Sequence, residues 1–393
     1  MTSTRRIRLG MVGGGHKAFI GAVHRIAARM DDRFTLVAGA FDADPDRGRD
    51  FARSIGIAPD RAYGGYQDML AAEAARPDPI DAVVIVTPNF LHFPVAKAAL
   101  EAGFHVICEK PMTTTLEDAQ TLAALVAATG RRFVLTHTYT GYPMVRQARA
   151  MVAAGRIGTL RRVQVEYAQD WLAEPVEATG AEGAVWRTDP AKAGLGGAIG
   201  DVGTHAYNLA AFVTGEEPVH LLADLTAFVP GRRVDDDAGI LLRYASGAKG
   251  GLWASQVATG NGNNLSLRVY GTQGGLEWWQ ERPEELWFTP LGQPRQLLRR
   301  NGAGSWPVAA ASSRVPAAHP EGYLEAFANL YRDAADLLLA HQEGAGAGEA
   351  APPASAMDPD CPLPDVAAGV RGLAFVSACL DSAARGSVWV PLG

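Results

Sequence analysis

The sequence is poor in cysteine and carries no excess of positive charge, and these two absences exclude several classes of protein. Its three cysteines, Cys108, Cys361 and Cys379, are far apart and form no Cys-x-x-Cys pair, which argues against a disulfide framework and against a thiolate metal site. Lysine and arginine together number 36 against 42 acidic residues, and the net charge is −6. No basic surface is therefore expected to attract nucleic acid.

Long hydrophobic runs are also missing. Residues 2–8 are polar and lead directly into a predicted strand, without the apolar core and small-residue cleavage site of a secretory leader. No uninterrupted apolar span approaches the roughly 20 residues that a membrane helix needs. We therefore expect a cytoplasmic protein that does not enter a membrane. A chain of 393 residues fits two domains of ordinary size.

The first motif is a strand, a glycine turn and a helix. Residues 7–12 predict a strand that runs into Gly13, Gly14 and Gly15, and a helix follows. The pattern Gly13-x-Gly15-x-x-Ala18 matches the dinucleotide-binding fingerprint, in which glycines let the backbone approach a pyrophosphate at a helix N-terminus. Three consecutive glycines are also typical of an ordinary flexible turn, so the motif needs support from its surroundings.

Asp42 gives that support. The second predicted strand, residues 34–41, leads into Asp42, 24 residues after Ala18. This is near the spacing expected for the acid that binds a ribose 2′-hydroxyl. A carboxylate at this point also repels a 2′-phosphate, so NAD is favoured over NADP as the cofactor. The alternative is that Asp42 only closes a turn before Pro45.

Polar residues follow the next predicted strands. Residues 80–86, 106–108 and 133–136 predict buried strands that alternate with helices, which indicates right-handed βαβ units and a parallel sheet. The residues expected at adjacent strand ends, on the side of the glycine turn, are Thr87, Asn89, His92, Glu109 and Lys110. Open α/β sheets bind their ligands at these ends. The alternatives are a surface lysine at Lys110 and, at His92, a helix-start residue that touches only backbone.

The second half of the chain has a different pattern. Long strands with few helices are predicted at residues 160–169, 221–228, 238–244, 250–258, 265–270 and 276–280. They indicate a large, mostly antiparallel open sheet, with a face that helices or a partner subunit must cover. We therefore predict an α/β Rossmann domain with a parallel sheet over residues 1–141 and a C-terminal α+β domain over residues 142–393.

Asp201 and His205 form a second candidate site. A glycine-rich run, residues 194–200, leads into a helix predicted to start at Asp201, and residues four apart on an α-helix share a face. His205 would act as a base, since histidine ordinarily titrates near neutral pH. Asp201 would orient His205 or bind a hydroxyl. The alternative is a helix cap and a satisfied, half-buried histidine. No metal site is expected, because the sequence has no His-Glu-x-x-His.

Together these motifs resemble the Gfo/Idh/MocA family of oxidoreductases, named for glucose–fructose oxidoreductase, inositol dehydrogenase and a rhizopine-catabolism protein. The resemblance covers nearly the whole chain. It rests on the order and spacing of the glycine turn followed by His24, Thr87-Pro88-Asn89-x-x-His92, Glu109-Lys110-Pro111 and Gly200-Asp201-x-x-x-His205. The family implies a Rossmann domain and an α+β domain whose open sheet makes the contacts of a homodimer or homotetramer. It also implies NAD or NADP, with sugars or cyclic polyols as substrates.

Carried over by motif, the resemblance implies that Lys110 is the catalytic lysine beside the nicotinamide and that Asp201 and His205 face the reacting hydroxyl. The residues that it suggests line the substrate pocket are His137, Tyr139 and Arg187. Our hypothesis is a dehydrogenase that moves hydride between nicotinamide and a secondary alcohol of a sugar, sugar derivative or inositol-like polyol. His205 would remove the hydroxyl proton, and the Lys110 ammonium would hold the developing alkoxide.

Two other functions fit part of the pattern. Some enzymes of this family use NAD transiently to oxidise a sugar hydroxyl, eliminate an aglycone and restore the cofactor, as a glycosidase or lyase with no net redox change. A non-catalytic nucleotide-binding sensor would leave Lys110 and the Asp201–His205 pair unexplained. The chain also departs from the common family pattern, because five residues separate Gly15 from Gly21. Either Ala18 takes the close-packing role of the third glycine, or the longer turn forms a bulge.

Overall fold

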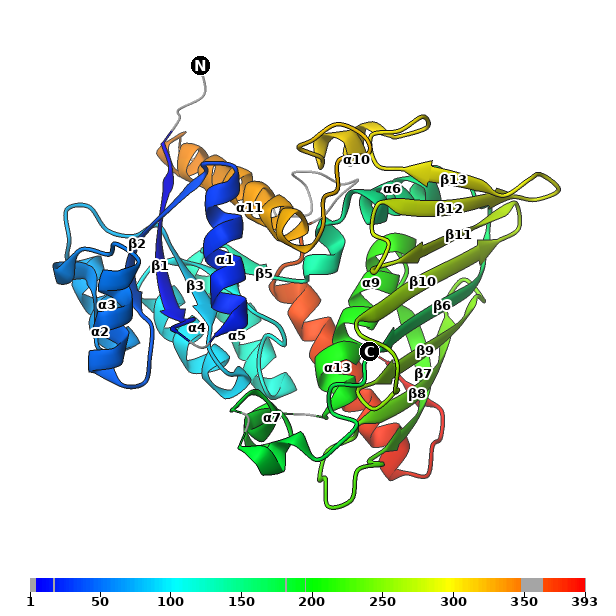
Figure 1. Cartoon of the computed structure of the whole chain (residues 1–393), viewed down its shortest axis with the longest axis horizontal. Helices are drawn as coiled ribbons and strands as arrows, with labels where there is room; N and C mark the ends of the chain where they lie inside the picture. The colour runs from blue at the N-terminus through cyan, green and yellow to red at the C-terminus, as the bar shows by residue number, and fades with distance from the viewer. Residues whose placement is uncertain (1–4, 17, 181, 195, 348–362, 393) are drawn as a thin grey trace. The chain divides into compact units, whose positions relative to one another are not determined.

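The computed structural model describes residues 5–16, 18–180, 182–194, 196–347 and 363–392 (Figure 1). The chain forms two compact units. The first unit comprises Met1–Thr113, Glu117–Thr138 and Tyr323–Val370, and the second comprises Thr114–Leu116, Tyr139–Gly322 and Arg371–Gly393. The single division expected between residues 141 and 142 is therefore too simple, because a later segment returns to the first unit.

The first unit is built on a five-stranded parallel sheet, as predicted. Its strands are β1 (Ile7–Gly13), β2 (Phe34–Ala40), β3 (Ala82–Val86), β4 (His105–Cys108) and β5 (Phe133–Leu135). They lie in the order β2-β1-β3-β4-β5. From β1 the chain passes to β2 on one side and then to β3 on the other. The carboxyl ends of β1 and β3 therefore form the switch point at which such sheets bind ligands.

The helices between these strands are α1 (Phe19–Met30), α2 (Pro45–Ser54), α3 (Tyr66–Ala74), α4 (His92–Glu101) and α5 (Leu116–Thr129). Local sequence explains the start of α2. The Asp44 carboxylate accepts the backbone N–H groups of Asp46 and Arg47, and Pro45 occupies the first turn, where its missing N–H costs nothing. The chain therefore turns sharply after β2 and leaves Asp42 at the strand end.

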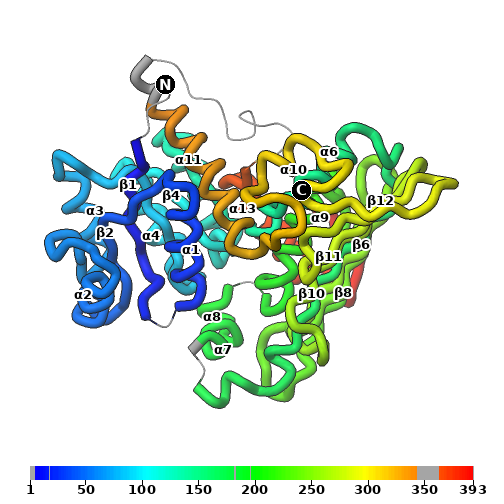
Figure 2. The backbone as a smooth tube through the Cα atoms, turned by 45° about the horizontal axis from the view of Figure 1, so that its top comes forward, coloured from blue at the N-terminus to red at the C-terminus, as the bar shows by residue number. Residues whose placement is uncertain are grey.

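Helix α11 (Tyr323–Ala347) belongs to the core of the first unit, although it follows most of the second unit in the sequence. Figure 2 shows α11 beside α1. Phe327 and Tyr331 are buried in the same apolar cluster as Ile7, Leu9 and Phe34 of the sheet. Parallel strands need cover on both faces, and α11 provides part of it. This packing is why the first unit includes residues beyond 322.

The second unit contains a nine-stranded sheet. Its strands are β6 (Leu160–Ala168), β7 (Pro218–Thr226), β8 (Asp237–Tyr244), β9 (Lys249–Ser255), β10 (Asn264–Gly271), β11 (Gly274–Trp279), β12 (Glu285–Pro290), β13 (Gln296–Arg299) and β14 (Val390–Pro391). Their order is β13-β12-β11-β10-β6-β9-β8-β7-β14. Only β6 and β9 pair in parallel, so the predicted mostly antiparallel sheet is confirmed. The sequence did not predict β12, β13 and β14.

The two faces of this sheet differ. In β8, Ile240 and Leu242 are buried while Leu241 is 47% exposed, the alternation of a strand with one packed face. Helices α6 (Pro143–Ala153) and α9 (Thr204–Thr214) pack against strands of the sheet. The shorter helices of this unit are α7 (Glu182–Arg187), α8 (Pro190–Ala193) and α10 (Pro307–Ala311).

Helix α13 (Val366–Ala384) is, among the described residues, the one helix long and apolar enough to cross a membrane by length and composition, with a mean hydropathy of 1.3. Arg371 and Asp381 interrupt its apolar sequence. Phe375 and Cys379 are fully buried, and the Ser382 hydroxyl oxygen accepts the backbone N–H of Ala223 in β7. These contacts are typical of a helix that packs in a protein core.

Candidate active site

The glycine turn after β1 has a backbone that approaches its neighbours closely. Gly13 and Gly14 have φ angles of +81° and +78°, a region that residues with side chains rarely adopt. A Cβ atom on Gly15 would lie 2.8 Å from the carbonyl oxygen of Phe41. The turn is therefore restricted to glycine by both conformation and space.

Gly21 explains the longer turn. It lies in the first turn of α1, and a Cβ atom there would lie 2.4 Å from the Cα atom of Gly14. Gly21 therefore lets α1 pack against the glycine turn, which is the role of the third glycine in the dinucleotide fingerprint. Ala18 occupies the N-cap position of α1 instead. Of the two possibilities left open by the sequence, close packing by Ala18 is wrong.

Asp42 follows β2 and lies beside the glycine turn. Its Oδ1 atom accepts the backbone N–H of Asp44 at 2.9 Å and the Arg47 guanidinium at 2.8 Å. The hydrogen bond from Arg47 outweighs burial and holds the pKa of Asp42 below its usual value. A Cβ atom on Gly15 would lie 3.7 Å from Asp42 Oδ2. Asp42 therefore closes a turn, as the alternative expects, and also presents a charged acceptor next to the glycines.

The loop after β3 lies against the same turn. A Cβ atom on Gly13 would lie 3.0 Å from Thr87 Cγ2. The Thr87 hydroxyl oxygen is buried and makes no hydrogen bond within the described residues. Asn89 begins the short helical turn Asn89–Leu91. A buried hydroxyl without a protein partner is rare unless a ligand or a water molecule forms a hydrogen bond with it. Thr87 therefore fits a site for a polar ligand.

His92 joins the loops after β3 and β4. Its Nδ1 atom lies 2.7 Å from the carbonyl oxygen of Pro111, and its Nε2 atom lies 2.9 Å from that of Thr87. Burial lowers the pKa of His92 and outweighs the two carbonyls, which act to raise it. A neutral ring has one N–H and therefore donates to only one of the two carbonyls. The ring nitrogens face backbone, as the alternative interpretation expects. His92 therefore fixes the two loops rather than offering a nitrogen to a ligand.

Glu109 and Lys110 follow β4. Glu109 is buried, and its Oε1 atom accepts hydrogen bonds from His24 Nε2 at 2.9 Å and Thr136 Oγ1 at 2.7 Å. Burial acts to raise the pKa of Glu109, but these two donors and the charge of Lys110 outweigh it, so the pKa lies below its ordinary value. The half-buried Lys110 therefore leaves the sheet beside a charged carboxylate.

These residues fit a dinucleotide. Glycines with positive φ, a buried hydroxyl at Thr87 and a charged acceptor at Asp42 surround the switch point between β1 and β3. The glycines allow a pyrophosphate to approach the backbone, and Asp42 lies where a ribose hydroxyl is bound in such folds. The chemistry of the donor set therefore agrees with NAD.

In the second unit, Asp201 lies in a π-helical turn, Ile199–Gly203, that precedes α9. The prediction of a regular helix from Asp201 is therefore wrong. The Asp235 carboxylate accepts the backbone N–H groups of Gly197 and Ile199 at 2.6 and 2.7 Å, which holds the start of the turn. Single π-helical turns occur frequently at functional sites. They are not predictable from α-helical spacing.

The Asp201 carboxylate is bound by residues from two other segments. Gln256, just after β9, donates its side-chain N–H to Asp201 Oδ2 at 3.0 Å. Arg187 Nε lies 3.5 Å from the same oxygen, and the Arg187 guanidinium lies 4.2 Å from the ring centroid of Trp186. Asp201 is therefore not a helix cap. Two of the predicted residues, Asp201 and Arg187, lie together.

His205 lies in the first turn of α9 beside two tyrosine rings, one of which is hydrogen-bonded to amide side chains. Its ring centroid is 4.8 Å from that of Tyr139 and 6.1 Å from that of Tyr167. The two tyrosine hydroxyls are 2.5 Å apart, and Asn263 Oδ1 accepts hydrogen bonds from Tyr167 at 2.7 Å and Gln169 at 2.8 Å. Tyr139 was predicted as a pocket residue. His137 lies after β5 in the first unit and is 2% exposed.

Sequence reasoning missed four polar residues of the second unit, which are Tyr167, Gln169, Gln256 and Asn263. They come from β6, β9 and β10 or from the ends of these strands. Their proximity depends on sheet register, in which Asn264 pairs with Ala168. The available signal was weak, because only two of the predicted strands, residues 160–169 and 276–280, end in an amide side chain. No single spacing in the sequence links these positions.

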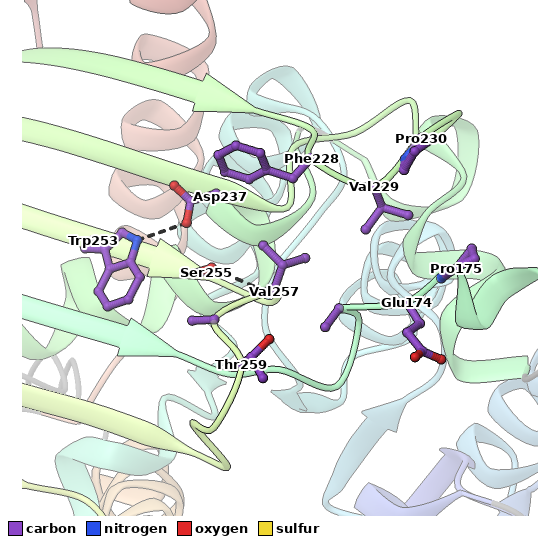
Figure 3. Close-up of a pocket in the computed structure, with 12 residues that line it drawn as sticks. Glu174, Pro175, Phe228, Val229, Pro230, Asp237, Trp253, Ser255, Val257 and Thr259 are labelled. Atoms are coloured by element: carbon purple, nitrogen blue, oxygen red, sulfur yellow. Dashed lines mark hydrogen bonds between the residues drawn. The ribbon is translucent and has the colours of Figure 1, made fainter.

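A separate cavity of about 440 Å³ lies at the ends of β8 and β9 in the second unit. Figure 3 shows Phe228 and Glu174, which come from two loops around this cavity. The Trp253 Nε1–H group donates a hydrogen bond to Asp237 Oδ2 at 3.0 Å. None of the predicted site residues lines this cavity. Among the residues that the structure describes, no group of three or more His, Cys, Asp or Glu side chains could hold a metal ion.

Comparison with known proteins agrees with this geometry. Residues 7–137 match the model of the oxidoreductase family with an NAD-binding Rossmann fold, and residues 145–277 match the GFO/IDH/MocA C-terminal domain. The uncharacterized oxidoreductase YfiI of Bacillus subtilis is 37% identical over 98% of this chain and 97% of its own. The levoglucosan dehydrogenase of Pseudarthrobacter phenanthrenivorans is 29% identical over 78% of this chain and 84% of its own.

A solved structure is similar over nearly the full length. The crystal structure of an inositol dehydrogenase homolog from Azotobacter vinelandii, complexed with NADH and myo-inositol, has a TM-score of 0.90 and 41% sequence identity, and the match covers 98% of each chain. The fold, the glycine turn and the sequence similarity lead to one assignment. The chain belongs to the Gfo/Idh/MocA family of NAD-dependent oxidoreductases.

Proposed function

We propose that this enzyme transfers hydride between NAD and a secondary alcohol of a cyclic polyol or sugar, with an inositol-like ring as the first candidate. The observation that carries the proposal is the group of tyrosine rings and amides around His205, formed by Tyr139, Tyr167, Gln169 and Asn263. Cyclic polyols have apolar C–H faces and hydroxyl edges, and aromatic rings with a few amides suit both. The relatives described above include one crystallised with myo-inositol and one named for levoglucosan.

In this proposal NAD would supply the hydride acceptor when bound, and the protein's own residues provide position and charge. Oxidation leaves developing negative charge on the substrate oxygen. The Lys110 ammonium, next to the charged Glu109 carboxylate, stabilises that oxygen. His205 accepts the hydroxyl proton, and Asp201 binds a neighbouring hydroxyl or orients the substrate. Lys110 and His205 belong to different units. The proposal requires that both nevertheless act on one substrate.

The other predicted residues take supporting roles in the same proposal. Gly13, Gly14 and Gly15 would bind the pyrophosphate, Asp42 the ribose, and Thr87, Asn89 and Glu109 the nicotinamide end of NAD. His137, Tyr139 and Arg187 would line the substrate site. His92 would act through the loops that it joins. A reaction without net redox change is not proposed, because the relatives named for an activity include dehydrogenases and a reductase.

The proposal is tested by Lys110→Ala with Lys97→Ala as its control. Lys97 is an exposed lysine paired with Glu101 on α4. With NAD and a panel of cyclic polyols, NADH formation by the Lys110→Ala enzyme should fall by about 100-fold or more, while NAD affinity measured by calorimetry stays close to that of the wild type. Lys97→Ala should be unaffected. Wild-type turnover in Lys110→Ala would overturn the assignment.

We also propose that two or four copies associate through the open face of the nine-stranded sheet. The exposed fractions of Leu241 and Tyr270 on this face are 47% and 37%, and an open sheet face can pair with the same face of a second copy in a symmetric contact. Light scattering of Leu241→Glu should show a smaller species than the wild-type protein. An unchanged mass would place the contact elsewhere or leave the chain monomeric.

A further inference from the structure

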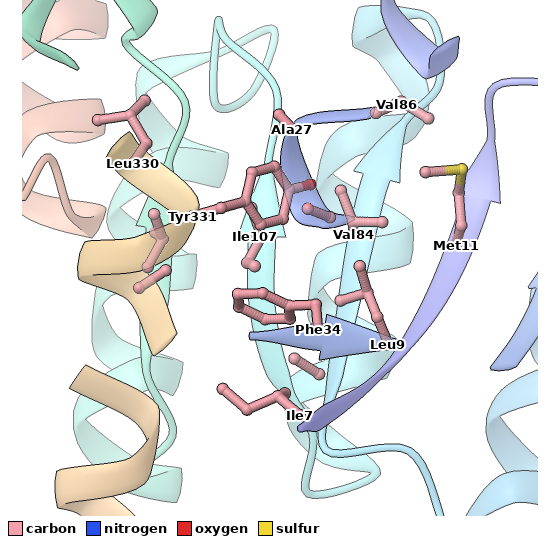
Figure 4. Packing of buried hydrophobic residues seen from close by; sticks show 14 of the residues in the cluster. Ile7, Leu9, Met11, Ala27, Phe34, Val84, Val86, Ile107, Leu330 and Tyr331 are labelled. Carbon is pink, nitrogen blue, oxygen red and sulfur yellow. The ribbon is translucent and has the colours of Figure 1, made fainter. Parts of the chain in front are cut away.

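A buried chain of hydrogen bonds runs behind Lys110. Tyr331 on α11 bonds through its hydroxyl to His24 Nδ1 at 2.7 Å, and His24 Nε2 lies 2.9 Å from Glu109 Oε1. Figure 4 shows Tyr331 extending from α11 toward Ile107 of β4. Tyr331 is 3% exposed and His24 is 0% exposed. Solvent therefore does not replace any of these bonds.

The direction of the hydrogen bond at Glu109 follows from the charge of its carboxylate. A charged carboxylate can only accept, so His24 donates to it from Nε2, and the other ring nitrogen, Nδ1, is bonded to the Tyr331 hydroxyl. Thr136 donates a second hydrogen bond to Oε1 at 2.7 Å. Burial, with the nearby Glu109 charge, raises the pKa of Tyr331 well above its usual value, so this hydroxyl keeps its proton. The bonds together keep Glu109 charged.

The second oxygen of Glu109 connects this chain to Lys110. Glu109 Oε2 accepts the backbone N–H of Lys110 at 3.2 Å, and the Glu109 backbone N–H donates to the carbonyl oxygen of Ile85 at 3.0 Å. The carboxylate is thus tied at one oxygen to His24 and Thr136 and at the other to the backbone that carries the lysine. A change in the donors at Oε1 would let the carboxylate rotate and would shift the start of the Lys110 side chain.

We propose that Thr136 and Tyr331 are positioning residues for Lys110, acting through the carboxylate of Glu109. The inference rests on the proposed role of Lys110. The folding stability of the first unit does not require this arrangement. Apolar side chains of the same size often stabilise a core as well as a buried charged group does. The arrangement instead links a tyrosine hydroxyl on α11, 307 positions after His24 in the chain, through His24 to the strand end that carries Lys110.

The first test compares Thr136→Val with Thr136→Ser. Valine has the shape of threonine but removes the donor to Glu109, whereas serine retains the hydroxyl. In the intact enzyme, kcat for polyol oxidation should fall by about threefold to tenfold in Thr136→Val, with the dissociation constant for NAD close to the wild-type value. Thr136→Ser should restore most of kcat. Equal kcat in the two variants would overturn the positioning role of Thr136.

The second test compares Tyr331→Phe with Tyr63→Phe. Each change removes one tyrosine hydroxyl of the first unit, and Tyr63 donates to the buried Glu73 at 2.9 Å, on the β2 side of the sheet. Both variants should lose thermal stability to a similar extent. Only Tyr331→Phe should lower kcat, again by about threefold to tenfold, without a matching rise in the KM for NAD. Equal kcat in the two variants would show that Tyr331 is only structural.

These outcomes separate the inference from the proposed function. Near-wild-type turnover in Lys110→Ala would overturn the proposed function and the inference with it. A large loss in Lys110→Ala together with wild-type kcat in Thr136→Val and Tyr331→Phe would overturn the inference alone. A loss of NAD affinity in the two positioning variants would also contradict it, because the hydrogen bonds would then support the cofactor rather than the lysine.

Discussion

The candidate site residues of the two units are placed by different physical means. In the first unit they lie at the ends of consecutive parallel strands, so each follows its strand directly in the sequence, as Asp42 follows β2 and Lys110 follows β4. In the second unit they gather from separate strands of one sheet and from a π-helical turn, as Gln256 and Asp201 do. In the first unit, the position of a candidate residue can therefore be predicted from its own strand. In the second unit, it depends on how separate strands pair.

The largest expected effect on cofactor binding tests the local arrangement of the first unit. Gly21→Ala would place a Cβ atom 2.4 Å from the Gly14 Cα atom, and backbone overpacking of this kind costs about 2 kcal/mol or more. We expect NAD affinity, measured by calorimetry, to fall by roughly thirtyfold or more. Gly65→Ala is the control, because Gly65 has an extended backbone and ample space. Normal NAD binding by Gly21→Ala would show that α1 need not pack against the turn.

An intermediate effect tests the second unit. Asn263→Ala removes the acceptor of the Tyr167 hydroxyl and of Gln169. The KM for the polyol should rise by about tenfold, while the dissociation constant for NAD stays unchanged. Gln164→Ala is the control, because Gln164 lies on β6 with its side chain on the opposite face from Tyr167. A change in NAD binding by Asn263→Ala would mean that the two units do not divide cofactor and substrate as proposed.

The smallest effect concerns cofactor choice. Arg47 is largely exposed and partly neutralises Asp42. Exposed ion pairs contribute about 0.2–1 kcal/mol, so Arg47→Ala should change the preference for NAD over NADP by only about threefold, in favour of NAD, because the carboxylate would repel a 2′-phosphate more strongly. The ratio of kcat/KM for the two cofactors measures this. An unchanged ratio would indicate that Asp42 does not face the ribose.

Sequence reasoning recovered the first unit in more detail than the second. Apolar strands that alternate with helices indicate a parallel sheet. The residue that follows each strand, such as Thr87 or Glu109, can then be placed at the ligand-binding edge of that sheet from the sequence alone. Which earlier elements α11 covers was not predictable, because its apolar stripe fits any available face. The roles of Tyr331 and Asn263 depend on packing and register across about 100 or more positions, and local spacing carries no information at that range.

The missed elements have similar causes. Strands β12 and β13 are short, and charged residues flank them in the sequence. The alternation of apolar and polar residues that predicts a strand is therefore weak there. The π-helical turn at Asp201 follows glycines whose backbone is held by Asp235, which lies 34 positions later in the sequence. Gly21 appeared as a departure from the usual fingerprint, yet it takes the usual close-packing role from a later position in the helix.

In the mechanism that we propose, Lys110 of the first unit and His205 of the second act on the same hydroxyl during one hydride transfer. A double-mutant cycle of Lys110→Ala, His205→Ala and the double variant, measured as kcat/KM for the polyol, tests it most directly. Residues that act as one unit in a single step have strongly non-additive effects. We expect the double variant to be little slower than the slower single variant. Losses that simply multiply would contradict it.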